Sequence, residues 1–416
     1  MSDSEKKDSN KTTFDELLSP LDEALEKIES QRKVHHREVL SFTGFVHLLI
    51  YYFISAPKSG RQLITDIITA SKSLNLGEVK RATFFDAFNR FPVSWFATLF
   101  TAVLTSITWQ SIPELDLLGK LYLVDGSIFP ALTKMFWAEY KKDNPAIKLH
   151  LCFELNRMVP LMFVIGKGKS SEIDALRQML QAGATYIADR GYVSFALLKD
   201  IRNAYAHFVI RMKGNLVYKT TEVLSLKLPS EVAHIFTGVS DKLVELTNAT
   251  GTPIYRLVTF KVGKVDYLIL TSRLDLSTFE IILLYAYRWQ VELAFRFLKR
   301  TLNGLHLLST TSEGINIQFY VLLIAALLQL RLKQECVRQQ EILEMPSNHN
   351  EPKTEKIPGL MVPIDNMLSA RGQTFLATVG EKLHRYWKIS IHWVITLRNL
   401  LAHPFNQRAQ FLLASM

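Results

Sequence analysis

Cysteine is scarce in this sequence, and no metal-binding motif accompanies it. The 416 residues contain two cysteines, Cys152 and Cys336, which stand far apart and outside any Cys-x-x-Cys or Cys/His cluster. The 11 histidines form no His-Glu-x-x-His motif. These absences argue against a disulfide framework and a structural zinc site, and they favour a protein of the reducing cytoplasm.

A long apolar run is also missing. The uninterrupted apolar stretch at residues 319–328 is about half as long as a bilayer-spanning helix requires. We therefore expect a buried core helix there, and no membrane partner. The first residues, MSDSEKKDSNKTT, are charged and lack the apolar stretch of a secretory signal.

Apolar residues and positive charge are plentiful. Hydrophobic residues make up 48% of the chain, enough for a large core in two or three domains. The net charge is +10, and beyond residue 40 there are 42 Lys and Arg against 29 Asp and Glu. A basic excess of this size favours a polyanionic partner, nucleic acid before membrane, because Lys and Arg that contact phosphates release counterions.

The pattern along the chain predicts four regions. They are a polar tail and leading amphipathic helix (1–35), a helical N-terminal DNA-binding region (36–117), a catalytic core (118–305) with an all-β insertion (213–275), and a helical C-terminal region (306–416) with a mobile loop (346–359). In the second region, two helices joined at LNLG resemble a DNA-reading pair, although an ordinary helical hairpin has the same pattern. Candidate base contacts on the second helix are Arg81, Thr83, Asn89 and Arg90.

The core has the pattern of an α/β fold. Three strand-like segments, KLYLVDG, IKLHLCFEL and VPLMFVIG, follow one another through short links, as in an antiparallel meander. The strands ATYIAD and HFVIRM come later, separated by helices, which suits parallel pairing. This is the strand order of a ribonuclease-H-like core. Five further strand-like segments form the insertion, NLVYKT, VAHIFTG, KLVELTN, PIYRLVTFK and VDYLILT.

Two aspartates follow strands of this core. Asp125 comes directly after LYLV and Asp189 directly after TYIA, at the carboxyl ends where functional groups gather in open sheets. If the two strands are parallel neighbours, the carboxylates approach each other and need a hard divalent cation. Each aspartate alone is also ordinary turn chemistry, since Asp-Gly and Asp-Arg-Gly favour turns.

A long helix is predicted from a capping box at Ser277 and Glu280 to about Leu302. At about 100° per residue, Tyr285, Arg288, Glu292 and Lys299 lie within a stripe about 60° wide, with Trp289 beside it. A solvated face with an Arg288–Glu292 pair would explain the charges. It explains the tryptophan less well.

The spacing of Tyr285, Arg288, Glu292 and Lys299 resembles the YREK signature of the insertion-sequence-four family of DDE transposases, and VDGS and ADRGY resemble its two aspartate motifs. The resemblance covers about residues 118–330. It implies a catalytic triad of Asp125, Asp189 and Glu292 that binds two Mg²⁺ or Mn²⁺ ions, and it implies that Tyr285, Arg288 and Lys299 hold a DNA phosphate.

The implied activity is cut-and-paste transposition, with cleavage at terminal inverted repeats and joining to target DNA by two-metal phosphoryl transfer. Synapsis implies a homodimer, and the setting would be the bacterial cytoplasm, at the nucleoid. Some relatives cut through a hairpin and stack a flipped base, for which Trp289 is the candidate. The insertion has no tryptophan, so a second stacking residue would be Tyr218, Phe236, Tyr255 or Tyr267. The alternatives are an inactive DNA-binding relative and a general metal-dependent nuclease.

Overall fold

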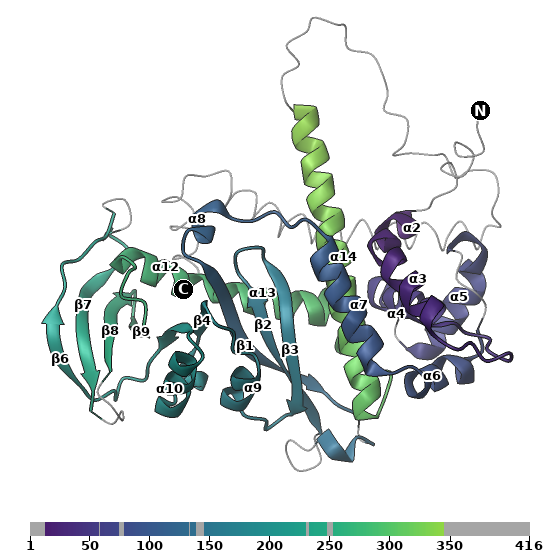
Figure 1. The fold of residues 1–416 in the computed structure, drawn as a ribbon, viewed down its shortest axis with the longest axis horizontal. Coiled ribbons are helices and arrows are strands. Elements are labelled where there is room, and N and C mark those ends of the chain that lie inside the picture. Colours follow the sequence, from purple (N-terminus) through teal and green to yellow (C-terminus); the bar gives the residue numbers. More distant parts are fainter. Residues whose placement is uncertain are drawn as a thin grey trace, which may run out of the picture. The chain divides into compact units, whose positions relative to one another are not determined.

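The structure, a computed structural model, describes residues 13–344 except 58, 75–78, 133, 139–144, 230–232 and 248–252 (Figure 1). The predicted tail at 1–12, most of the LNLG joint, the loop at 346–359 and the rest of the C-terminal region lie outside the described residues. The described chain divides into two compact units. One combines residues 13–108 with 301–344, and the other spans residues 109–300.

The first unit is helical. Its elements are α2 (Thr13–Leu18), the 3₁₀ turn η1 (Ser19–Leu21), α3 (Asp22–Gln31), α4 (Phe42–Ser55), α5 (Gly60–Leu74), α6 (Arg81–Arg90), α7 (Val93–Ser106) and α14 (Ser312–Glu344). The prediction of one continuous leading helix is wrong, because Pro20 stands in a 3₁₀ turn between two helices. The apolar stripe itself, which includes Leu21 and Leu25, is buried.

The apolar run at 319–328 lies within α14, which packs on α4 and α7. By length and composition the segment Ser312–Glu335 could cross a membrane, but 67% of its apolar window is buried inside the protein. Phe319, Leu323 and Leu327 are at most 1% exposed. The prediction of a buried core helix is therefore confirmed.

The second unit is built on one nine-stranded sheet of order β3-β2-β1-β4-β5-β9-β8-β7-β6. Its strands are β1 (Lys120–Pro130), β2 (Ala146–Glu154), β3 (Val159–Lys167), β4 (Ala184–Ala188), β5 (His207–Arg211), β6 (Tyr218–Val223), β7 (Thr237–Leu246), β8 (Ile254–Val262) and β9 (Val265–Thr271). The first three strands are antiparallel, whereas β4 is parallel to both β1 and β5. Both pairing predictions are confirmed, and the fold is α/β.

The predicted insertion does not form a sheet of its own. Its last strand, β9, pairs antiparallel with β5 through Val209 and Thr271, so the insertion extends the core sheet. The strand predicted at residues 232–238 is wrong in its described part, because His234 and Ile235 lie in a turn and β7 begins at Thr237. One strand therefore replaces two expected ones.

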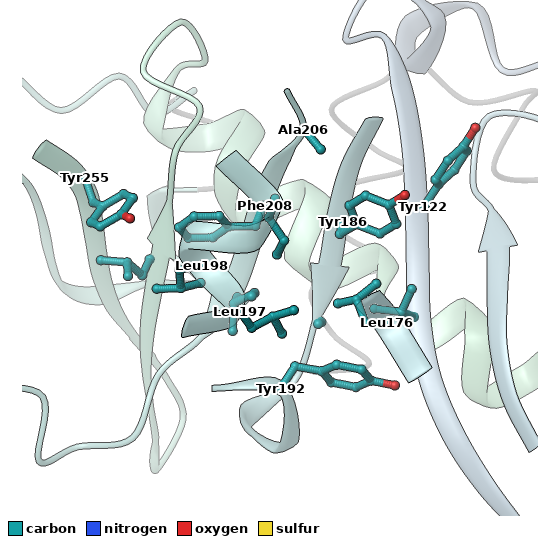
Figure 2. Close-up of a cluster of buried hydrophobic side chains, with 14 of the residues drawn as sticks. Tyr122, Leu176, Tyr186, Tyr192, Leu197, Leu198, Ala206, Phe208 and Tyr255 are labelled. Carbon is teal, nitrogen blue, oxygen red and sulfur yellow. The ribbon is translucent and has the colours of Figure 1, made fainter. Parts of the chain in front are cut away.

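Helices cover both faces of the core sheet. On one face α9 (Glu172–Gln178) and α10 (Phe195–Asn203) contribute Leu176, Leu197 and Leu198 to a buried cluster that also holds Tyr122 and Tyr186 of the strands (Figure 2). On the other face lie α12 (Thr278–Tyr287) and α13 (Trp289–Arg296). Three short elements complete the unit, α8 (Pro113–Asp116), η2 (Phe136–Ala138) and η3 (Arg190–Tyr192).

The helix that carries the predicted motif is not uniform. Ser277 and Glu280 form the expected capping box at its start. The helix is interrupted at Arg288, between α12 and α13, and then widens into the π-helical turn η4 (Phe297–Thr301). A uniform period therefore misplaces Lys299, which lies inside the π-helical turn, where hydrogen bonds span five residues instead of four.

Candidate active site

The two aspartates lie at the same level of neighbouring parallel strands. The prediction that Asp125 follows the end of its strand is wrong, because β1 stays paired with β2 as far as Pro130, whereas Asp189 does follow the end of β4. Leu123 of β1 pairs with Ile187 of the parallel strand β4, and each aspartate lies two residues further on. Side chains alternate between the faces of a strand, and Tyr122 and Val124 belong to the cluster under α9 and α10. Asp125 therefore projects from the opposite face, where α13 packs on β1.

Asp125 is a partly buried carboxylate held close to its own backbone. Its Oδ1 accepts a hydrogen bond of 2.8 Å from the N–H of Gly126. Burial raises the pKa of Asp125 to about 6, and the charges of Glu292 and Glu172 add to the rise, while the Gly126 N–H and Arg288 oppose it. The ionised form thus lacks compensating positive charge.

Tyr285 of α12 contacts the second aspartate. Its hydroxyl donates to Oδ1 of Asp189 over 3.2 Å, and the side chain is buried. Burial and the charge of Asp189 raise the pKa of Tyr285 to about 12. The tyrosine therefore stays a neutral donor across the physiological range.

Arg288 and Glu292 form the ion pair that the helical spacing allows. Nη2 of Arg288 lies 2.8 Å from Oε1 of Glu292, and their side chains are 15% and 35% exposed. Both charges also act on Asp125. The structure therefore brings Arg288, Glu292 and the first aspartate into one electrostatic neighbourhood.

Lys299 reaches back to β1. Its Nζ donates to Oγ of Ser127 and to the carbonyl of Ile128, both over 2.7 Å, and lies 4.7 Å from the ring centre of Phe129. Burial lowers the pKa of Lys299, and the charge of Asp125 opposes that shift. The Lys299 ammonium therefore binds β1 two and three residues beyond Asp125.

The aromatic candidates divide into two groups. Trp289, the first residue of α13, is partly exposed, and so is Tyr218 of β6. Phe236, Tyr255 and Tyr267 are buried, and Tyr267 stacks on Phe260 with ring centres 5.0 Å apart. The buried rings serve the core in this conformation and offer no free face to a base.

Arg211, the last residue of β5, is a cation that sequence reasoning missed. Ile210 pairs with Ala188, so Arg211 lies next to the level of Asp189, and its charge acts on Tyr285. Its guanidinium lies 4.3 Å from the ring centre of Tyr267. The sequence could have pointed to Arg211, because it lies near the end of the predicted strand HFVIRM. That strand was expected to be parallel to the strand that precedes Asp189.

The donor chemistry of this site fits a hard divalent cation. Asp125, Asp189 and Glu292 offer carboxylate oxygens, the ligands that Mg²⁺ and Mn²⁺ prefer. The raised pKa of Asp125 shows a carboxylate whose ionised form needs positive charge. Within the described ranges no three His, Cys, Asp or Glu side chains are close enough to hold a metal ion as they stand.

The candidate base contacts lie on α6, in the helical unit. Arg81 and Asn89 are exposed and Thr83 is half-buried. Arg90 donates to the carbonyl of Leu40 over 2.6 Å and lies 4.6 Å from the ring centre of Phe91. Arg90 is exposed too but is bonded within the protein, and the Arg81 guanidinium lies 5.5 Å from the ring centre of Phe85.

Comparison with known proteins finds one family whose sequence model, described as "Transposase DDE domain", matches residues 117–328. A protein of Sinorhizobium fredii named "Putative transposase y4zB" is 27% identical over 253 residues, which are 59% of this chain and 69% of that protein. A Geobacillus stearothermophilus protein named "Probable transposase for insertion sequence element IS5377" is 24% identical over 246 residues, 59% of this chain and 65% of the relative. The family match spans Asp125, Asp189 and Glu292.

Proposed function

This chain belongs to the family of transposase DDE domains, and we propose that it is a cut-and-paste DNA transposase of the insertion-sequence-four type. One observation carries the proposal. Asp125 within β1 and Asp189 directly after β4 lie at the same level of adjacent parallel strands, and Tyr285, at the end of α12 just before Arg288 and Glu292, binds Asp189. A core of ribonuclease-H-like type is supported by the order β3-β2-β1-β4-β5.

We assign the catalytic roles to the three carboxylates. Asp125, Asp189 and Glu292 would hold two Mg²⁺ or Mn²⁺ ions, which supply positive charge at the phosphoryl oxygens of the reacting phosphodiester. Arg288 pairs with Glu292 and Tyr285 donates to Asp189, so both groups orient these carboxylates.

Three groups are suited to bind a DNA phosphate. Arg288 offers a planar fork of donors, Lys299 a point charge and Tyr285 a neutral hydroxyl. In the free protein each of them is bonded to the protein itself, to Glu292, Ser127 and Asp189 respectively. Binding of a phosphate would replace those bonds, and Trp289 would stack a flipped base if the ends are cut through a hairpin.

The other assignments concern the whole chain. The helical region at 36–117 would recognise the terminal inverted repeats, with Arg81, Asn89 and Arg90 as the exposed candidates. Synapsis of two ends requires a homodimer, and the 306–416 region is the candidate for that contact. Target DNA would enter the same catalytic core (118–305), in the bacterial cytoplasm.

An excision assay tests the proposal. A plasmid that carries this gene's own flanking DNA is incubated with the native chain or with Asp189→Ala, with and without Mg²⁺. We expect an excised linear fragment only with the native chain and metal, and unchanged gel shifts of end DNA with Asp189→Ala. Excision by Asp189→Ala would refute the triad. Equal cutting of a plasmid without the inverted repeats would indicate a general nuclease, and end binding without any product an inactive relative.

A further inference from the structure

The backbone next to each aspartate shares a feature on the face of the sheet away from α13, although Asp125 lies within strand β1 and Asp189 precedes the turn η3. A glycine comes close behind each aspartate, Gly126 after Asp125 and Gly191 after Asp189. A methyl group on Gly191 would overlap Oε2 of Glu172, and one on Gly126 would lie 3.5 Å from Oε1 of the same side chain. One carboxylate therefore lies against Gly191 and close to Gly126.

A helix cap and an ion pair with Lys148 hold Glu172 in this position. It is the first residue of α9, directly after Ser171, whose Oγ caps the helix by accepting from the N–H of Asp174. Lys148 of β2 donates from Nζ to Oε1 of Glu172 over 2.8 Å, and the two side chains are 14% and 26% exposed. A methyl group on Gly126 would also lie 2.7 Å from Cε of Lys148.

A buried polar group lies near this pair. Tyr192, two residues beyond Arg190 at the lower edge of the cluster in Figure 2, is 1% exposed, and its hydroxyl has no hydrogen-bond partner. The charges of Asp125 and Glu172 both add to the rise in its pKa that burial causes. Glu172 thus lies near the active site without facing it, since α9 covers the opposite face of the sheet from α13.

We propose that Glu172 is a positioning residue, whose carboxylate, held by Lys148, acts as a spacer between Gly126 of β1 and the Gly191 turn and so holds Asp189 in place relative to Asp125. This inference rests on the proposed function, because it gives the spacing of those two aspartates a purpose. It also accounts for glycine at both positions, because a Cβ at Gly191 would displace the Glu172 carboxylate and a Cβ at Gly126 would displace the Lys148 side chain that holds it. Side chains that contact metal ligands, and not the metal itself, commonly orient those ligands in this way.

The shared space supplies a test by double-mutant cycle. Gly191→Ala should push the Glu172 carboxylate away and disturb the spacing, and Glu172→Ala should remove the spacer. We expect each single change to raise the Mn²⁺ concentration for half-maximal binding by roughly tenfold or more, the range typical of groups that support metal ligands. In the Glu172→Ala background Gly191→Ala should cost little further, because its steric conflict is gone.

Mn²⁺ binding is measured calorimetrically, without DNA, and single-turnover nicking of a labelled end is measured alongside it. Asp174→Ala is the matched control, because Asp174 lies on the same first turn of α9 and pairs with Arg177 on the surface. Circular dichroism verifies that each variant folds, and Gly191→Ala tests the idea independently if Glu172→Ala does not fold. Native Mn²⁺ affinity in both single variants, or fully additive losses in the double variant, would overturn the positioning role. Failure of the native chain to nick its ends would instead count against the proposed function.

Discussion

At the scale of single residues, the hydroxyl of Tyr285 is the clearest link between the helix and the aspartates. Its bond to Asp189 is 3.2 Å long and its ring is buried, so Tyr285→Phe removes one hydrogen bond without leaving a cavity. We expect nicking to slow by about 10- to 100-fold, because an oriented carboxylate loses its donor. The free energy of unfolding should fall by only about 1 kcal/mol. Single-turnover nicking and urea unfolding measure the two effects.

Tyr186→Phe is the matched control for that change. The Tyr186 hydroxyl donates to the carbonyl of Met179 over 2.6 Å, within the cluster on the face opposite to the site. The same hydroxyl accepts from the N–H of Gln181 over 2.7 Å, so Tyr186→Phe should lose at least as much stability as Tyr285→Phe while nicking at the native rate. An equal slowing in both variants would show that Tyr285 acts through general stability and not through Asp189.

At the scale of elements, the start of α12 is anchored to the extension of the sheet. Arg256 of β8 pairs with Asp241 of β7 at 2.6 Å, with side chains 6% and 0% exposed, and Thr278 of α12 donates to the same Asp241 carboxylate. Arg256→Ala should cost about 3–5 kcal/mol, since it leaves a buried carboxylate unpaired. Thermal unfolding measures this loss. Arg157→Ala, which breaks a more exposed pair with Glu154, should cost less than about 1 kcal/mol.

The same elements show what the sequence could predict. The strands β1 to β5 and the capping box at Ser277 were predictable, because apolar runs, turn residues and caps are local signals. The pairing of β9 with β5 was not predictable. Val209 and Thr271 are far apart in the sequence, and no local sequence pattern shows which sheet edge a strand will join. The interruption at Arg288 and the π-helical turn were not predicted, because the helical period was assumed to be uniform.

Prediction from the sequence was limited in a similar way at the candidate site. The motif spacing predicted that Asp125, Asp189 and the helix with Tyr285, Arg288 and Glu292 share one site, and in the structure Tyr285 donates a hydrogen bond to Asp189. Glu172 was not predicted as a site residue, because a glutamate at the start of a helix is common and has an ordinary role there. Its importance comes from Gly126 and Gly191, which approach it only after α9 packs on the sheet.

At the scale of the whole molecule, the helical unit carries a buried histidine that should make it sensitive to acid. His47 of α4 has an Nε2 with no hydrogen-bond partner, and burial lowers its pKa to about 4, while the charge of Asp15 on α2 opposes the shift. Between that value and the ordinary 6.5 the unfolded chain binds a proton that the folded chain does not. Stability must therefore fall as pH decreases through this window.

The size of the effect follows from the shift, at about 1.4 kcal/mol per pKa unit, or about 3 kcal/mol in all. Urea unfolding followed by helical circular dichroism, repeated from about pH 7 to pH 4, should show this loss in the native chain. His47→Leu should be more stable at neutral pH, because it removes an unpaired buried nitrogen, and should lose less on acidification. His35→Leu, at an exposed position, should follow the native curve. If His47→Leu loses as much stability in acid as the native chain, other groups are responsible for the acid sensitivity of the helical unit.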